Sequence, residues 1–162
     1  TKFSDPSTVP DGARSGVFSP DGTVVFFPSG VSPYIHAYEW SGSGFGTKYA
    51  DPATLPPDYC GNLALSHDGT VVAVSHATAP YVTAYAWSGS GFGAKFADPA
   101  VRPTGFGFGI GFSVDSTAIA IAHQFFPRVS AYRWSGSGFG TKFANPSTFP
   151  AGDGRSIAFS PN

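Results

Sequence analysis

The heptapeptide Trp-Ser-Gly-Ser-Gly-Phe-Gly at residues 40–46 decides the fold, because the chain repeats it unchanged at 87–93 and 134–140. The copies are 47 residues apart, and a Lys-aromatic pair followed by Asp-Pro or Asn-Pro comes after each one. A fourth such segment, Lys2-Phe3 with Asp5-Pro6, opens the chain. Self-similarity at a fixed period of 20–50 residues is typical of repeat architectures. We therefore expect one domain over 1–162, made of repeats 1–46, 47–93, 94–140 and an incomplete 141–162.

Each unit contains four short segments that favour β-strands. The first and second of these flank a turn of the Asp-Gly type, which is a strong hairpin signal. The second segments are rich in β-branched residues and apolar on both faces, so we expect both faces to be covered. The expected strands are 16–19, 23–27, 34–40 and 47–50 in the first unit, with equivalents at 63–66, 70–74, 81–87, 110–113, 117–121, 128–134 and 157–160.

Composition narrows the classes of protein. With 21 Gly and 15 Pro in 162 residues, long helices are nearly excluded. A formal net charge of −1 gives no reason to expect binding to nucleic acid. Apolar runs stay well short of the roughly 18 residues that a membrane span needs, so we expect no membrane insertion. A single Cys cannot build a disulfide framework.

Four antiparallel strands in a unit of about 47 residues, with both faces buried, predict a β-propeller blade. We thus expect an all-β chain with blades of four antiparallel strands. Counting a lone fourth strand at the N-terminus and a lone first strand at 157–160 gives 14 strands, or about three and a half blades. A closed propeller typically has at least four blades. The chain is then expected to be part of a larger propeller, or to be completed by neighbouring chains as a closed oligomer or a filament.

The hairpin Phe-Ser-Pro-Asp-Gly at 18–22, its variants at 65–69 and 112–116, and the aromatic end of each third strand resemble WD-repeat and YVTN-type β-propellers. Tyr-x-Trp-Ser stands where WD repeats have Trp-Asp, and the Gly-His signature is missing, so their hydrogen-bond network is not carried over. The unit is most similar to uncharacterised repeat proteins of tailed phages and bacteria. This resemblance implies the propeller fold over the whole chain and favours a virion or extracellular location.

Positions that are identical in every unit should serve the scaffold. We expect the three tryptophans to be buried between blades and the motif phenylalanines to plug the same spaces. The hairpin aspartates should accept hydrogen bonds from turn amides. The predicted structural residues are Trp40, Trp87, Trp134, Phe45, Phe92, Phe139, Asp21, Asp68 and Asp115.

Positions that differ between units are free for other tasks, and they cluster in two kinds of loop: those joining fourth to first strands and those joining second to third strands. In a propeller both kinds lie on one rim, opposite the invariant turns. Exposed loop aromatics are typical of contact surfaces, although they can also fold inward over the blade. The predicted binding rim contains Tyr59, Arg102, Phe106, Phe108, His76, His123, Gln124, Phe125 and Phe126.

Candidate chemistry is sparse. His76 and His123 occupy the same position in adjacent units and could approach each other around a metal, but a hydrogen bond to a loop carbonyl is the more usual role. Cys60 matches Gly107 and Gly154, which indicates a packed thiol rather than a nucleophile. The sequence identifies no facing pair of carboxylates for glycosidase chemistry. We therefore predict no enzymatic activity, no metal site and no cofactor.

Two functional hypotheses follow. The first is a non-enzymatic structural or interaction module, such as a phage virion or cell-surface attachment protein, whose partners are proteins: neighbouring chains or the remainder of a longer chain. The alternative is a lectin-like propeller that binds glycans through its aromatic rim loops. Specific, saturable binding on a glycan array would favour the second.

Overall fold

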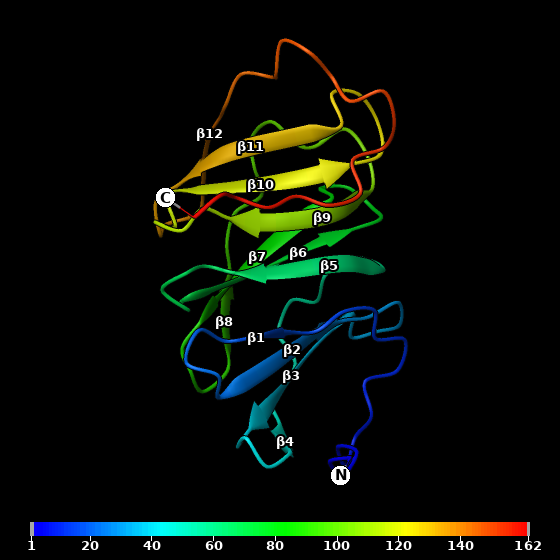
Figure 1. Cartoon of the computed structure of the whole chain (residues 1–162), viewed down its shortest axis with the longest axis vertical. Helices are drawn as coiled ribbons and strands as arrows, with labels where there is room; N and C mark the ends of the chain where they lie inside the picture. The colour runs from blue at the N-terminus through cyan, green and yellow to red at the C-terminus, as the bar shows by residue number, and fades with distance from the viewer. Residues whose placement is uncertain (1, 162) are drawn as a thin grey trace.

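The computed structural model describes residues 2–161, so the outer bounds of the first and last repeats, Thr1 and Asn162, lie outside the described residues. Three antiparallel sheets of four strands each are stacked face to face along the longest axis (Figure 1). Within this part of the chain, no helix has the length and apolar character needed to cross a membrane.

Each sheet takes its first three strands from one repeat, and its fourth strand crosses the boundary to the next repeat. Within a sheet the strands are hydrogen-bonded in chain order. The first contains β1 (Val17–Phe18), β2 (Val24–Pro28), β3 (Ile35–Trp40) and β4 (Phe45–Lys48). The second contains β5 (Cys60–Leu65), β6 (Val71–His76), β7 (Val82–Trp87) and β8 (Phe92–Lys95). The third contains β9 (Gly107–Phe112), β10 (Ala118–His123), β11 (Val129–Trp134) and β12 (Phe139–Lys142). The all-β blade architecture is therefore confirmed, and we number the sheets blade 1 to blade 3.

The fourth strand of each blade starts two residues earlier than expected, inside the invariant motif. Gly42 has φ 77° in the turn after β3, a conformation that glycine adopts without a steric penalty. The turn is therefore tight, and β4 begins at the motif residue Phe45, which pairs with Trp40. A register shift between Tyr38 and Trp40 then accommodates an extra residue as a bulge.

The count of 14 strands was wrong for the described residues, which form twelve. Neither the segment after Lys2 nor residues 157–160 is a strand. The physical reason is the same at both ends. A strand needs a hydrogen-bonded neighbour, and the described residues supply no neighbouring strand to either segment.

The core lies between the blades. One cluster joins Phe26 and Ala37 of blade 1 to Val74 of blade 2, and a second joins Ala84 of blade 2 to Ile121 of blade 3. All six residues of β6 are buried, because this central strand of the middle blade is covered on both faces. This explains why its first four residues, Val-Val-Ala-Val, are apolar without alternation, and why the polar Ser75 and His76 are also buried.

Each motif tryptophan lies in a cluster of rings that we call the tryptophan box. Around Trp87, the ring of Phe26 from the preceding blade is 4.7 Å away, and those of Tyr49 and Phe92 are both 5.1 Å away. Trp87 and Trp134 are only 6% and 5% exposed. Trp40 is less buried than expected, because the described residues place no preceding sheet against it.

The hairpin aspartates close the turn between the first and second strands. The carboxylate of Asp68 accepts hydrogen bonds from the Ser66 hydroxyl and from both the backbone N–H and the hydroxyl of Thr70. These bonds hold the pKa of Asp68 below its usual value, with the Ser66 bond as the main cause. The same bonds recur at Asp21 and Asp115.

Candidate functional site

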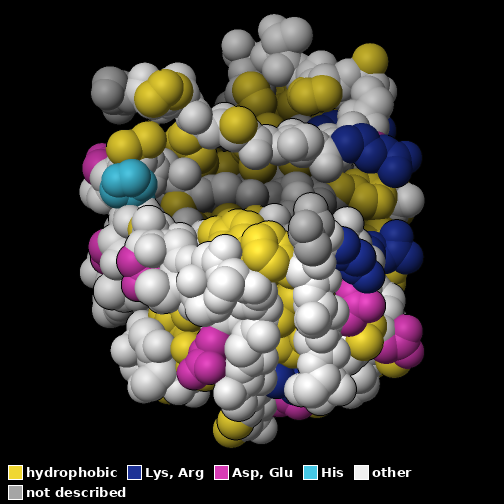
Figure 2. Space-filling view, turned by 60° about the horizontal axis from the view of Figure 1, so that its bottom comes forward, with side chains coloured by type: hydrophobic (Ala, Val, Ile, Leu, Met, Phe, Trp, Pro, Cys, Tyr) yellow, Lys and Arg dark blue, Asp and Glu magenta, His cyan; other side chains and the backbone are white. Residues whose placement is uncertain are grey.

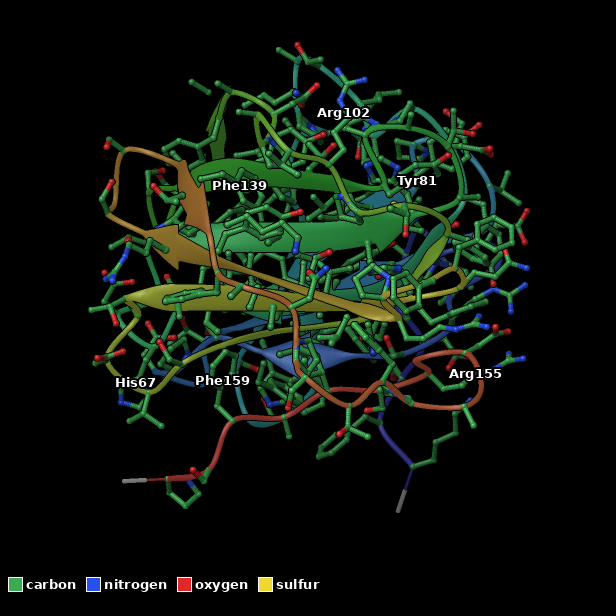
Figure 3. The ribbon with its side chains drawn as sticks, turned by 90° about the horizontal axis from the view of Figure 1, so that it is seen from above. His67, Tyr81, Arg102, Phe139, Arg155 and Phe159 are labelled. Atoms are coloured by element: carbon green, nitrogen blue, oxygen red, sulfur yellow. The ribbon has the colours of Figure 1, made fainter. Side chains whose placement is uncertain are left out.

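The variable loops gather on one rim. In blade 3 the Thr104 hydroxyl, from the loop before β9, donates to the backbone oxygen of Phe126, from the loop after β10, at 2.7 Å. Figure 3 shows Tyr81 and Arg155 on this side of the molecule and His67, from the hairpin turn between β5 and β6, on the opposite side. In Figure 2 the Lys and Arg side chains gather mainly along one side of the visible face.

A row of stacked side chains crosses this rim, and we call it the rim strip. The Arg14 guanidinium lies 4.3 Å from the centre of the Tyr59 ring, which is 5.3 Å from that of Phe106. Phe106 is 4.4 Å from Phe108, and the Arg155 guanidinium lies 4.7 Å from the Phe108 ring. The strip therefore connects all three blades and the C-terminal segment, with an exposed arginine at each end and three partly exposed rings between them.

Glycines make this stacking possible by bringing the first strands of adjacent blades together. A Cβ on Gly61 would lie 2.9 Å from the backbone oxygen of Gly107, and one on Gly107 would lie 2.8 Å from the Ser75 Cβ. Both are closer than real side chains allow. Because β5 and β9 approach so closely, the rings of Tyr59 and Phe106, which directly precede these strands, contact one another.

The structure brings together three of the predicted rim residues: Tyr59, Phe106 and Phe108. Phe125 and Phe126 lie apart from the strip and are 56% and 60% exposed. The ring of Phe126 packs 4.2 Å from that of Phe149.

The other predicted rim residues have local roles. Arg102 is exposed and lies 3.9 Å from the carboxylate of Asp98, which is outside the strip. Gln124 hydrogen-bonds through its backbone: its N–H donates to Phe106 O, and its carbonyl accepts from Arg128.

Sequence reasoning missed Arg14 and Arg155 as site residues. A signal for them was present, because Arg14-Ser15 and Arg155-Ser156 occupy the same position in the first and last repeats.

In the described part of the chain, no three His, Cys, Asp or Glu side chains cluster in a way that could hold a metal ion. His76 is fully buried; its Nδ1 lies 2.7 Å from the Thr78 carbonyl oxygen, and its Nε2 lies 3.0 Å from the Thr83 hydroxyl. The carbonyl can only accept, so Nδ1 carries the proton and Nε2 accepts from Thr83. Burial lowers the pKa of His76 to about 4, which keeps it neutral.

His123 makes the equivalent contact with Ser130 at 3.0 Å. Burial also raises the pKa of the Cys60 thiol, so this group is protonated and inert at neutral pH. His76, His123 and Cys60 are therefore parts of the blade core rather than of the exposed rim.

Comparison with known proteins supports the fold. No protein-family model matches the sequence, and no curated protein matches it. Among solved structures, a Bacteroides fragilis protein named as a candidate 6-phosphogluconolactonase superposes with a TM-score of 0.71 at 12% identity, over 94% of this chain and 43% of its own.

Two further solved structures are similar. Hydrazine synthase of Kuenenia stuttgartiensis gives a TM-score of 0.65 at 13% identity, over 96% of this chain and 40% of its own. The WD40 repeats of RRP9 give a TM-score of 0.58 at 12% identity, over 78% of this chain and 37% of their own. The chain thus spans about two fifths of the length of these proteins. At such identities the likeness concerns the fold alone: this chain has the β-propeller fold, of which it forms three complete blades.

Proposed function

We propose that the chain is a non-enzymatic interaction module that contacts a protein partner through the rim strip. The observation that carries this proposal is the row of rings from Tyr59 to Phe108, partly exposed and stacked between two arginines. Tyr and Arg are enriched at the energetic centres of protein interfaces. Because the rings and guanidinium groups already hold one another in place, binding would cost little conformational entropy.

The environment of the titratable groups supports a role without catalysis. A general base needs a pKa near the working pH and access to substrate, whereas His76 is buried and its pKa is low. A nucleophilic thiol needs a lowered pKa, whereas burial raises that of Cys60. The proposal extends to a virion or cell-surface setting, which rests on the resemblance of the repeats to those of tailed-phage and bacterial proteins.

Affinity capture with matched variants tests this role. The double variant R14A/R155A removes both exposed guanidinium groups, and R133A removes an exposed arginine outside the rim strip. We expect the wild-type chain and R133A to retain a protein partner that R14A/R155A does not retain. That partner should bind the purified wild-type chain in a saturable manner. Equal retention by all three baits, or binding that does not saturate, would contradict the proposal.

A second candidate is a lectin for acidic sugars. Aromatic planes stack on sugar rings, and a guanidinium group binds a carboxylate in bidentate fashion; the strip places Arg155 beside Phe108. A glycan array separates the two candidates. Saturable binding to uronic or sialic acid glycans that R14A/R155A abolishes would favour the lectin, and a silent array together with a captured protein would favour the protein-binding module.

A further inference from the structure

The two ends of the chain are copies of the same segment. Residues 1–20 begin Thr-Lys-Phe and end Arg-Ser-Gly-Val-Phe-Ser-Pro, while residues 141–161 begin Thr-Lys-Phe and end Arg-Ser-Ile-Ala-Phe-Ser-Pro. Each segment has the sequence that connects the fourth strand of one blade to the first strand of the next. We call them the N-terminal segment (2–20) and the C-terminal segment (143–161).

The N-terminal segment covers blade 1 as a preceding blade would. Its Phe3 ring lies 5.3 Å from Trp40, just as Phe96 of blade 2 lies 5.1 Å from Trp134 of blade 3. The Tyr38 hydroxyl donates to the Thr8 backbone oxygen at 2.7 Å, and Tyr132 makes the same bond to Val101.

The C-terminal segment lies where the first strand of a fourth blade would lie. The Gly154 N–H donates to His123 O at 3.1 Å, which repeats the bond from Cys60 N to Ser29 O between blades 1 and 2. A Cβ on Gly109 of β9 would lie 2.8 Å from the Ser156 Cα, so the segment runs against β9 (Figure 1). Residues 157–160 nevertheless form no strand, because no second strand adjoins them.

Each open end therefore contains part of an interface between blades. At the C-terminal end, Phe143 and Phe159 hold the positions of Phe96 and Phe112 in the Trp134 box, but no tryptophan lies between them, and Phe143 is 39% exposed. At the N-terminal end, His36 of β3 is 5% exposed and both of its ring nitrogens lack a hydrogen-bond partner. A buried polar group without a partner is costly.

We propose that two copies of this chain join head to tail by strand exchange. The C-terminal segment of each copy replaces the N-terminal segment of the other, so that residues 157–159 pair with β2 of the second copy in place of β1. Phe143 and Phe159 then enclose the Trp40 of that copy. Two such junctions close a ring of six blades, within the four to eight that propellers typically have.

The C-terminal segment has the advantage in this exchange. It starts at the end of β12, which already holds Phe143 near the next blade position, whereas residues 2–10 belong to no strand. The strand to be replaced is also weak, because β1 pairs with β2 at only two positions, while β5 and β9 each pair at five.

The exchange would also complete the rim strip. Arg155 matches Arg14 in the repeat, so in the dimer Arg155 would stack on the Tyr59 of the second copy while remaining beside its own Phe108. The strip would then continue around the ring. This inference does not rest on the proposed function, since it concerns the blade interface rather than the rim's partner.

A proline substitution tests the exchange. In the ladder between β1 and β2, the Ser19 N–H donates to Val24 O. Hydrogen-bonded pairs alternate along an antiparallel ladder, so the next hydrogen-bonded pair is Val17 with Phe26. Ala158 matches Val17, so A158P removes the N–H that would bond to Phe26 of the second copy. Ala158 is exposed and outside any strand here, so A158P should leave the monomer's thermal midpoint unchanged. A158S is the control that keeps the N–H.

Sedimentation velocity over a concentration series reads the outcome. We expect the full wild-type chain and A158S to sediment as a dimer of twice 16.8 kDa. A158P should sediment as a monomer, or dissociate at a concentration at least tenfold higher than the wild-type chain does. A wild-type monomer at every concentration, species larger than a dimer, or a dimer unaffected by A158P would each overturn the proposal.

Discussion

Truncation of Trp87 should remove a large part of the stability of the chain. The side chain is 6% exposed and contacts the rings of Phe26, Tyr49 and Phe92, one of which belongs to the sheet of the preceding blade and one to its outgoing loop. A buried Trp→Ala change typically costs about 3–5 kcal/mol because it leaves a cavity. Aromatic pairs contribute about 0.5–1.5 kcal/mol each beyond the area they bury. We therefore expect W87A to lower the free energy of unfolding by about 4–5 kcal/mol.

The loss should be measured by urea unfolding at one low protein concentration, with fluorescence of Trp40 and Trp134 as the signal. The control is F125A, which truncates an aromatic side chain that is 56% exposed and should cost about 0.5 kcal/mol or less. The whole free energy of unfolding of a domain is only about 5–15 kcal/mol, so the difference between the costs of W87A and F125A is easy to resolve. A W87A cost below about 1 kcal/mol, or one equal to that of F125A, would refute the packing of the blades through this residue.

Three further outcomes are expected. D68A should lower the free energy of unfolding by about 1–2 kcal/mol at neutral pH, because three hydrogen bonds are lost. Because the folded pKa of Asp68 is lowered, the difference in stability between D68A and wild type, measured by urea titration, should shrink as the pH falls through that pKa. Burial lowers the folded pKa of His76 to about 4 from 6.5 in the unfolded chain, so its contribution to the free energy of unfolding should decline by about 3 kcal/mol as the pH falls from 6.5 to 4. H76Q should reduce that decline in calorimetric melts. G107A should cost about 1–3 kcal/mol, because its Cβ would lie 2.8 Å from a neighbouring carbon, whereas G152A, with no atom within 4 Å, should show an almost unchanged thermal midpoint.

The repeat predicted the blade architecture because every blade needs the same contacts. Trp87 recurs in every unit because each blade needs a tryptophan box, and Asp68 recurs because each hairpin turn needs a carboxylate. The structure shows Trp87 in such a box and Asp68 in such a turn. The exact start of the fourth strands could not be predicted. The motif reads as one glycine-rich turn, and the bulge that starts β4 at Phe45 depends on pairing with Trp40 rather than on local propensity.

The ends and the rim were harder to predict for another reason. Residues 157–160 have the sequence of a strand, but strand formation depends on a partner that this chain does not supply. Arg14 and Arg155 each reach a ring of a neighbouring segment, and these contacts depend on how closely the chain approaches itself at Gly30 and Gly109. A comparison of repeats identifies which positions vary, but not which of those positions meet in space.

A crystal structure of the full chain would test the central claim most directly, because it shows which strands pair. We predict three separate antiparallel sheets, with β2 to β4 in the first, β5 to β8 in the second and β9 to β12 in the third, and with Trp87 between the first and second sheets. A continuous sheet in which strands of these three groups hydrogen-bond to one another, as in a solenoid, would contradict the assignment of the groups as propeller blades.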